Sequence, residues 1–310
     1  MKIYVGVTDY DWFTILKNAN CEEVNFWKPG AGTKFKALNS NDLFLFKLHS
    51  PRNYIVGGGY FVRFSILPTF LAWDAFGIQN GTRSLKELNE RVLKYKKRNK
   101  IDTTSDYIGC IILTEPFFFD EKDWIPVPEN WSNSIVQGKT YITETEVGLQ
   151  LYSQVEERLE HTSVADRTTS LFKSTGERYG SEQIVRHRLG QGSFRIIVTE
   201  AYNRKCAITG EKTLPVLNAA HIRPYAEAGP HAIQNGLLLR TDLHTLFDKG
   251  YITVDDKYTI NVSTRLHDDF GNGKIYYAHH GQKLLVIPNQ LTDLPSKEFL
   301  HWHNEHIYLG

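Results

Sequence analysis

Two histidines and one asparagine in the second half of the chain place the strongest constraint on its fold. His221 and Asn235 are fourteen residues apart, and His244 follows Asn235 by nine residues. The surrounding patterns predict a strand, a second strand and a helix, in the order 215–222, 236–240 and 242–247. Asp242 is a good N-cap for this helix. The three side chains therefore belong to one compact strand–loop–strand–helix unit.

Residues of these types suit the hydrolysis of a phosphodiester beside one metal ion. Such cleavage needs an activated water and a cation near the leaving oxygen. His221 ends a predicted strand and can act as general base near neutral pH. Asn235 can fix the His221 imidazole or brace the loop. His244 and Asp248 lie one turn apart on one helix face, which suits a metal-binding pair. Each residue alone also fits a structural role, and their joint occurrence is what favours a site.

The second half of the chain resembles the HNH endonucleases, whose site is built on the ββα-metal fold. The likeness covers roughly residues 178–302 and is carried mainly by Ala220–Pro224, Asn235–Leu239 and Leu243–Asp248. The resemblance implies His221 as general base, Asn235 as orienting residue and His244 as metal ligand. It also implies a divalent cofactor (Mg²⁺, Mn²⁺ or Ni²⁺) and double-stranded DNA as substrate.

The sequence departs from this family pattern at two positions. Many members carry an Asp, Glu or His just before the catalytic histidine as a further metal ligand, where this chain has Ala220. The ion would then be held by His244 with Asp248, or mainly by His244, phosphate and water. Cys206 stands alone where some relatives pair cysteines around a structural zinc. The missing ligand keeps open a catalytically silent nucleic-acid-binding module.

Basic residues around the motif are expected to contact DNA phosphates. Six Lys or Arg and two Glu occur between residues 178 and 205, around a Gly–Gln–Gly turn that precedes a predicted helix over 193–202. Backbone amides at a helix N-terminus suit phosphate binding. The expected phosphate contacts are Arg186, Arg188, Gln191, Arg195, Arg204, Lys205 and Arg223.

The first 160 residues predict mostly strands, which favours a β-barrel with one or two helices. Strands are predicted at 3–7, 42–48, 53–64 and 107–113, and helices at 84–98 and 144–160. Gly57–Gly59 interrupts one strand pattern and predicts a bulge or a close backbone approach.

This first part resembles the PUA superfamily, most nearly its EVE branch, over about residues 1–155. The resemblance is carried by Asp42–Lys47, Asn53–Phe61 and Ala72–Gly77. It implies a pocket for a modified or flipped base, and each candidate aromatic also fits an ordinary core. The loop 25–35 is the best candidate, because large aromatic residues in a Gly/Pro-rich loop are hard to bury. The expected pocket residues are Trp12, Phe26, Trp27, Lys34, Phe35, Tyr60 and Trp73.

Composition bounds the remaining expectations. The chain is 41% hydrophobic and 23% charged, as in globular proteins, and it has no apolar run of membrane-spanning length. The start of the chain shows no leader pattern, so we expect a cytoplasmic location. Cys21, Cys110 and Cys206 form no CxxC pair, which argues against a disulfide framework or a cysteine zinc ribbon.

The net charge is only +1, but Arg91–Lys100 holds six basic and no acidic residues. This run is either a solvated helix face or a phosphate-contacting patch.

These patterns together predict an α+β protein with two domains. The expected boundaries are 1–160 for a PUA/EVE-like β-barrel, 161–176 for a linker and 177–310 for a ββα-metal HNH nuclease. The leading hypothesis is a modification-dependent restriction endonuclease that reads 5-methylcytosine or 5-hydroxymethylcytosine and cuts with the second domain. The alternative mark is a phosphorothioate linkage or another modified base. Because one such site cuts one strand, we expect a homodimer, or two binding events, to cut both strands.

Overall fold

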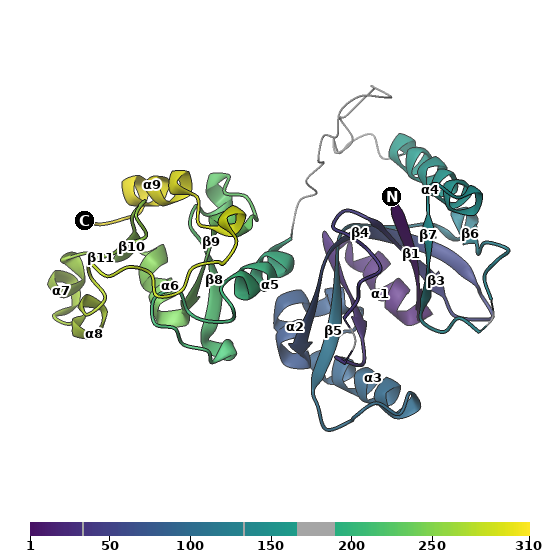
Figure 1. Cartoon of the computed structure of the whole chain (residues 1–310), viewed down its shortest axis with the longest axis horizontal. Coiled ribbons are helices and arrows are strands. Elements are labelled where there is room, and N and C mark those ends of the chain that lie inside the picture. The colour runs from purple at the N-terminus through teal and green to yellow at the C-terminus, as the bar shows by residue number, and fades with distance from the viewer. Residues whose placement is uncertain (33, 133, 166–189) are drawn as a thin grey trace. The chain divides into compact units, whose positions relative to one another are not determined.

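The computed structural model describes residues 1–32, 34–132, 134–165 and 190–310 (Figure 1). The chain forms two compact units, Met1–Arg188 and Leu189–Gly310. Helices and strands are mixed in both units, which confirms the predicted α+β class. No helix in these four ranges combines the length and the apolar character needed to cross a membrane. Of the expected linker, residues 161–165 extend a helix, and residues 166–176 lie outside the described ranges.

One mixed sheet organises the first unit. Its strands are β1 (Lys2–Thr8), β2 (Glu23–Lys28), β3 (Leu43–Leu48), β4 (Tyr54–Pro68), β5 (Tyr107–Phe118), β6 (Ile125–Pro126) and β7 (Gly138–Ile142). The main helices are α1 (Tyr10–Ala19), α2 (Thr69–Phe76), α3 (Leu85–Arg98) and α4 (Glu146–Ala165). The strand order is β2-β5-β4-β3-β1-β7, and β6 pairs with β4. Strands β1 and β3 run parallel, and the other neighbouring pairs run antiparallel.

The sheet is open, so the predicted β-barrel is not confirmed. Strands β2 and β7 are the two ends of the path, and they do not pair with each other in the described part of the chain. The physical reason is that the sheet buries two separate cores, one on each face, whereas a barrel encloses a single interior.

Strand β3 shows how both faces are buried. Phe44 and Phe46 pack in the core that includes Trp12 and Leu16 of α1. Leu43 and Leu45 pack in the opposite core, which includes Leu151 and Val155 of α4. Successive side chains of a strand point to opposite faces, so a strand covered on both sides is apolar throughout. This accounts for five of the six residues of the fully buried sequence LFLFKL, and the buried Lys47 donates a hydrogen bond to Asn53.

The predicted loop over residues 25–35 is wrong in its first part, because Glu23–Lys28 forms strand β2. This strand pairs with β5, with Phe26 opposite Ile111. The ring of Phe26 packs against Trp12 at 5.3 Å and Phe44 at 4.7 Å between centroids. The turn-forming residues begin only at Pro29, and core packing before that point favours a strand. The helix α1, which carries Trp12, was not predicted.

The triple glycine in β4 forms the predicted bulge and close approach. The register between β4 and β5 shifts between Gly58 and Tyr60. A Cβ atom on Gly57 would lie 2.2 Å from the Phe117 carbonyl oxygen, and one on Gly58 would lie 2.7 Å from that of Phe44. Neighbouring backbones can come this close only where no side chain intervenes.

A hairpin followed directly by a helix forms the centre of the second unit. Strands β8 (Leu217–His221) and β9 (Gly236–Arg240) pair antiparallel, and α6 (Thr241–Asp248) follows without a loop. This confirms the predicted strand–loop–strand–helix order. The other elements are α5 (Gln191–Ala201), β10 (Ile252–Val254), β11 (Ile260–Val262), α7 (Arg265–Phe270), α8 (Lys274–Tyr277) and α9 (Lys297–His306).

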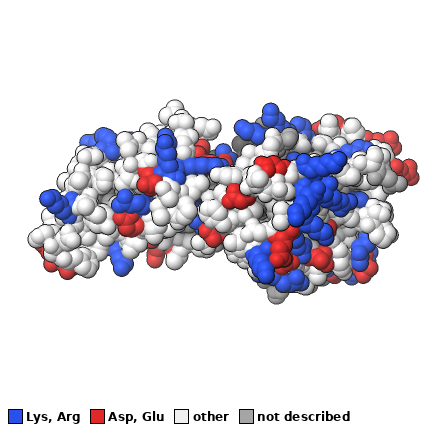
Figure 2. Space-filling model, turned by 90° about the horizontal axis from the view of Figure 1, so that it is seen from below, with Lys and Arg blue, Asp and Glu red and all other residues white. Residues whose placement is uncertain are grey.

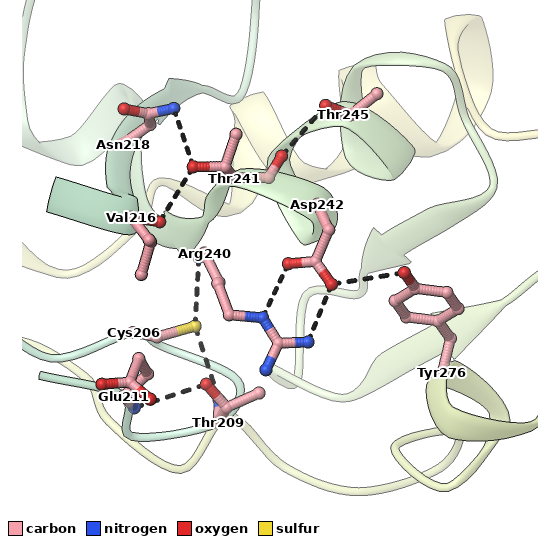
Figure 3. Close-up of polar contacts among 10 residues, drawn as sticks. All are labelled: Cys206, Thr209, Glu211, Val216, Asn218, Arg240, Thr241, Asp242, Thr245 and Tyr276. Carbon is pink, nitrogen blue, oxygen red and sulfur yellow. Dashed lines mark hydrogen bonds and ion pairs between the residues drawn. The ribbon is translucent and has the colours of Figure 1, made fainter. Parts of the chain in front are cut away.

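Asp242 is not the N-cap of α6, contrary to the prediction. Arg240 occupies the cap position, and Asp242 lies in the first turn. The Asp242 carboxylate accepts hydrogen bonds from Nε and Nη2 of Arg240, both at 2.7 Å, and from the Tyr276 hydroxyl (Figure 3). This two-point pairing lowers the pKa of Asp242 and takes the place of backbone capping.

Replacing Trp12 with alanine tests the core that joins α1 to the sheet. Trp12 is 4% exposed and contacts Phe26 and Phe46. We expect Trp12→Ala to lower the free energy of unfolding by about 3–5 kcal/mol, measured by denaturant titration. The matched control is Leu149→Ala on α4, because Leu149 is 55% exposed, and its effect should stay within about 0.5 kcal/mol. Equal small effects for both variants would contradict this packing.

Candidate active site

His221 lies at the end of β8, between a phenylalanine ring and a second imidazole. The ring of Phe194 from α5 stacks on it with centroids 3.9 Å and planes 11° apart. A hydrogen bond of 2.9 Å joins Nε2 of His221 to Nδ1 of His231. Within the described ranges, Nδ1 of His221 has no hydrogen-bond partner. The imidazole is therefore fixed at one nitrogen and available at the other.

The surroundings of His221 keep it neutral. Burial, followed by the neighbouring His231 and His244, lowers the pKa of His221 to about 4. At neutral pH its ring therefore carries a lone pair and no net charge. That is the protonation state a general base needs.

His231 is a site residue that the sequence reasoning missed. It lies in the loop between β8 and β9, ten residues after His221, and its ring stacks on Tyr225 with centroids 4.7 Å and planes 12° apart. A lone histidine in a loop carries no periodic signal. Its position inside the interval between His221 and Asn235 is the only hint in the sequence.

Asn235 braces the loop between the two strands. Its side chain is fully buried. Its Oδ1 accepts a hydrogen bond from the Arg223 amide at 2.8 Å, and its Nδ2 donates to the carbonyls of Arg223 and Pro230, both at 2.9 Å. Of the two roles considered from the sequence, these bonds correspond to bracing the loop, and none of them reaches the His221 ring.

His244 and Asp248 point toward each other from one face of α6. Nε2 of His244 lies 3.2 Å from Oδ2 of Asp248, and the two side chains are 24% and 55% exposed. Partial burial raises the pKa of Asp248, and the neighbouring His244 opposes this effect. The imidazole nitrogen and the carboxylate oxygen thus converge at a point that solvent can reach.

This pair fits a divalent cation with two protein ligands. Ala220 is fully buried and supplies no donor atom. No group of three or more His, Cys, Asp or Glu side chains is placed to hold an ion in the residues that the structure describes. One nitrogen and one oxygen donor leave the remaining coordination positions to water and phosphate, as hydrolysis requires. His244 and Asp248 would hold such an ion.

Polar contacts join the first residue of α6 to β8 and to the residue that precedes β8 (Figure 3). The Thr241 hydroxyl donates to the Val216 carbonyl at 2.9 Å, and Asn218 Nδ2 donates to Thr241 Oγ1 at 3.5 Å. The buried sulfur of Cys206 accepts hydrogen bonds from the amides of Thr209 and Arg240. The lone cysteine thus joins the turn after α5 to the end of β9.

A buried histidine holds the other end of α6. His303 of α9 lies against Phe247, with ring centroids 3.8 Å apart, and a 3.1 Å hydrogen bond joins its Nε2 to the Phe247 carbonyl. Its Nδ1 bonds to the Thr253 hydroxyl. Burial lowers the pKa of His303 to about 4. Both ring nitrogens are occupied, so this histidine is structural.

The residues expected to contact phosphate differ in their exposure and in their contacts. Gln191 is exposed in the first turn of α5, whose N-cap is Gly190. Arg195 and Lys205 are partly exposed. Nη2 of Arg204 lies 3.8 Å from Glu200. Arg186 and Arg188 lie outside the described residues.

Arg223 contacts its own unit in this structure. Its guanidinium lies over the Trp302 ring at 5.3 Å, and its Nε donates to the Glu227 carbonyl at 2.6 Å. A phosphate contact from Arg223 would require this bond to open or to be shared.

The expected base-pocket residues do not converge on one point. Trp12 is buried, and Phe26 and Phe35 pack beside it as partly exposed members of the same aromatic core. Trp27 donates from Nε1 to the Asn80 carbonyl and contacts Tyr95. Tyr60 packs against the core of the other sheet face. The two remaining residues are Trp73, partly buried on α2, and Lys34, exposed between β2 and β3.

Lys and Arg side chains gather on one face of the first unit (Figure 2). In the run Arg91–Lys100, exposed cations are Lys94, Lys97, Arg98 and Lys100. Lys96 is buried and donates to the Ser105 and Tyr107 carbonyls, so it belongs to the fold. The four exposed cations suit both predictions for this run, a solvated helix face and a phosphate-contacting patch.

Comparison with known proteins places the motif in a family. A family model described as HNH endonuclease matches residues 206–255. No curated protein matches the chain. A mutant of the ZmASCH protein from Zymomonas mobilis is 9% identical, covers 49% of this chain and 98% of its own, and has a TM-score of 0.33. A structure described as a modification-dependent TagI restriction endonuclease is 10% identical, covers 92% of this chain and 75% of its own, and has a TM-score of 0.28.

The family match covers β8, β9 and α6, and it contains His221, Asn235 and His244. Residues 206–255 therefore form an HNH endonuclease segment, and this match supports a DNA endonuclease.

Proposed function

We propose that this endonuclease hydrolyses DNA phosphodiesters with His221 as general base and one divalent ion held by His244 and Asp248. The observation that carries the proposal is the state of His221. Its ring is held by Phe194 and His231, its Nδ1 is available, and its pKa is low. The His244–Asp248 pair stands on the helix that follows the same hairpin.

The proposed reaction divides the work among a few side chains. His221 takes a proton from water, and the water oxygen forms a bond to phosphorus as the phosphorus–oxygen ester bond breaks. Asn235 holds the loop beside His221 through its bonds to Arg223 and Pro230. A divalent ion, when bound, would stabilise negative charge on the phosphate and on the leaving oxygen.

Replacing His221 with alanine tests the general base. We expect His221→Ala to lower kcat for cleavage of DNA by about 10²- to 10⁴-fold, because proton transfer to a positioned base contributes that much. Binding of DNA in a gel-shift assay should change little. The control is His267→Ala, since the side chain of His267 is 70% exposed on α7. Undiminished cleavage by His221→Ala would contradict the mechanism.

The pH dependence of cleavage follows from the low pKa of His221. Its value of about 4, against an ordinary 6.5, keeps the base neutral in mildly acidic solution. We expect kcat/KM to be flat from about pH 8 to about pH 5 and to fall as pH drops through about 4. Between the two pKa values the unfolded chain binds more protons than the folded one, so acid also weakens the fold. Circular dichroism at each pH separates the two effects, and an acid limb near 6.5 in the folded enzyme would oppose the assignment.

We also propose that the first unit restricts cleavage to modified DNA, with modified cytosine as the favoured mark. An HNH site contacts mainly the phosphate backbone and has little base preference, so selectivity must come from elsewhere in the chain. The partly exposed rings of Phe26 and Phe35 offer stacking surfaces. Stacking offsets the few kcal/mol that extruding a base costs. Cutting both strands would be done by a homodimer, because each chain carries one site.

A panel of substrates tests the selectivity. One plasmid is prepared unmodified, with 5-methylcytosine, with 5-hydroxymethylcytosine and with phosphorothioate linkages, and each form is digested with Mg²⁺, Mn²⁺ or Ni²⁺. We expect cleavage of the cytosine-modified forms and little cleavage of the unmodified one. Cleavage confined to the phosphorothioate form would show that this linkage, and not modified cytosine, is the mark that the protein recognises. Equal cleavage of all forms would exclude modification dependence, and no cleavage of any form would favour the silent module.

A further inference from the structure

The hydrogen bond between His221 and His231 has only one proton to share. Nε2 of His221 and Nδ1 of His231 are 2.9 Å apart. A neutral imidazole carries one N–H and one lone pair. One ring must therefore donate and the other accept, and the choice fixes where the proton of His221 lies.

Only one of the two arrangements leaves His221 able to act as a base. If Nε2 of His221 donates to His231, its Nδ1 bears a lone pair, and this nitrogen has no partner among the described residues. If His231 donates instead, both nitrogens of His221 are occupied, one by its own hydrogen and one by the accepted bond. A base at this position therefore requires His231 to be the acceptor.

His231 is held in place by its own set of contacts. Its ring stacks on Tyr225, and its centroid lies 5.7 Å from that of Phe194. The preceding residue, Pro230, accepts a hydrogen bond from the buried Nδ2 of Asn235. Asn235 thus acts on the catalytic ring through the loop, by placing His231 against His221.

We infer that His231 is a positioning residue, which accepts a hydrogen bond from Nε2 of His221 and so makes Nδ1 of His221 the atom that takes the proton from water. As the water O–H bond breaks, an N–H bond forms at Nδ1 and the ring becomes cationic. The bond from Nε2 to the lone pair of His231 then strengthens, because its donor is charged. This inference rests on the proposed role of His221.

Nitrogen NMR on the full chain tests the tautomer without any cleavage assay. With ¹⁵N-labelled histidine, long-range proton–nitrogen spectra distinguish a nitrogen that bears hydrogen from one that bears a lone pair. The His221 signals are assigned by their loss in His221→Ala. We expect hydrogen on Nε2 and a lone pair on Nδ1 at neutral pH. The opposite tautomer in the wild-type protein would overturn the inference.

Two substitutions of His231 separate the hydrogen bond from the packing. His231→Phe keeps a ring beside Tyr225 and removes the acceptor, whereas His231→Asn places an amide oxygen near the position of Nδ1. We expect His231→Phe to lower kcat roughly 10- to 100-fold with KM unchanged, as for other residues that orient a functional imidazole. The NMR signals of His221 should then show a mixture of tautomers. His231→Asn should restore most of kcat and the single tautomer.

The outcomes separate this inference from the proposed function. Wild-type kcat in a folded His231→Phe variant, or no advantage of Asn over Phe, would overturn the role of His231 even where His221→Ala abolishes cleavage. Absence of cleavage by the wild-type chain would contradict the proposed reaction. The NMR result would still show which of His221 and His231 donates the hydrogen bond between them. Circular dichroism and DNA binding establish that each variant is folded.

Discussion

The buried amide of Asn235 makes the interactions on which the candidate active site depends. Its three hydrogen bonds join the start and the end of the loop between β8 and β9. Leaving a buried amide without hydrogen bonds costs free energy. The loop is therefore stabilised in the conformation that completes all three bonds. His231 follows directly after one of the clamped residues and meets His221 across the loop. The asparagine of the motif therefore shapes the backbone around the His221 ring.

Two histidines of the second unit, both with a lowered pKa, differ in their hydrogen-bond partners. His221 and His303 are both held neutral, with pKa values of about 4. Among the residues that the structure describes, His303 has partners at both ring nitrogens, whereas His221 has a partner at one. The base role proposed for His221 rests on this second nitrogen, which His303 does not offer. A shifted pKa alone would not separate them.

In the first unit, packing on both faces of the sheet takes aromatic residues into two cores. Trp12, Phe26 and Phe35 belong to one core, whereas Tyr60 packs on the opposite face. An aromatic residue near Pro and Gly in the sequence was expected in a loop, but a strand covered by α1 takes Phe26 into the core. A base pocket in this unit would use ring edges that the core leaves partly exposed.

The sequence by itself determined the hairpin and helix of the nuclease segment, their order, and the residues His221, Asn235 and His244, because local periodicity and spacing encode them. It also determined the bulge at Gly57–Gly59, since glycine is the residue that permits such a close approach. Only the tertiary structure decided that the sheet is open, that Tyr276 donates to Asp242, and that His231 meets His221. These features depend on contacts between segments whose separation in the chain carries no periodic signal.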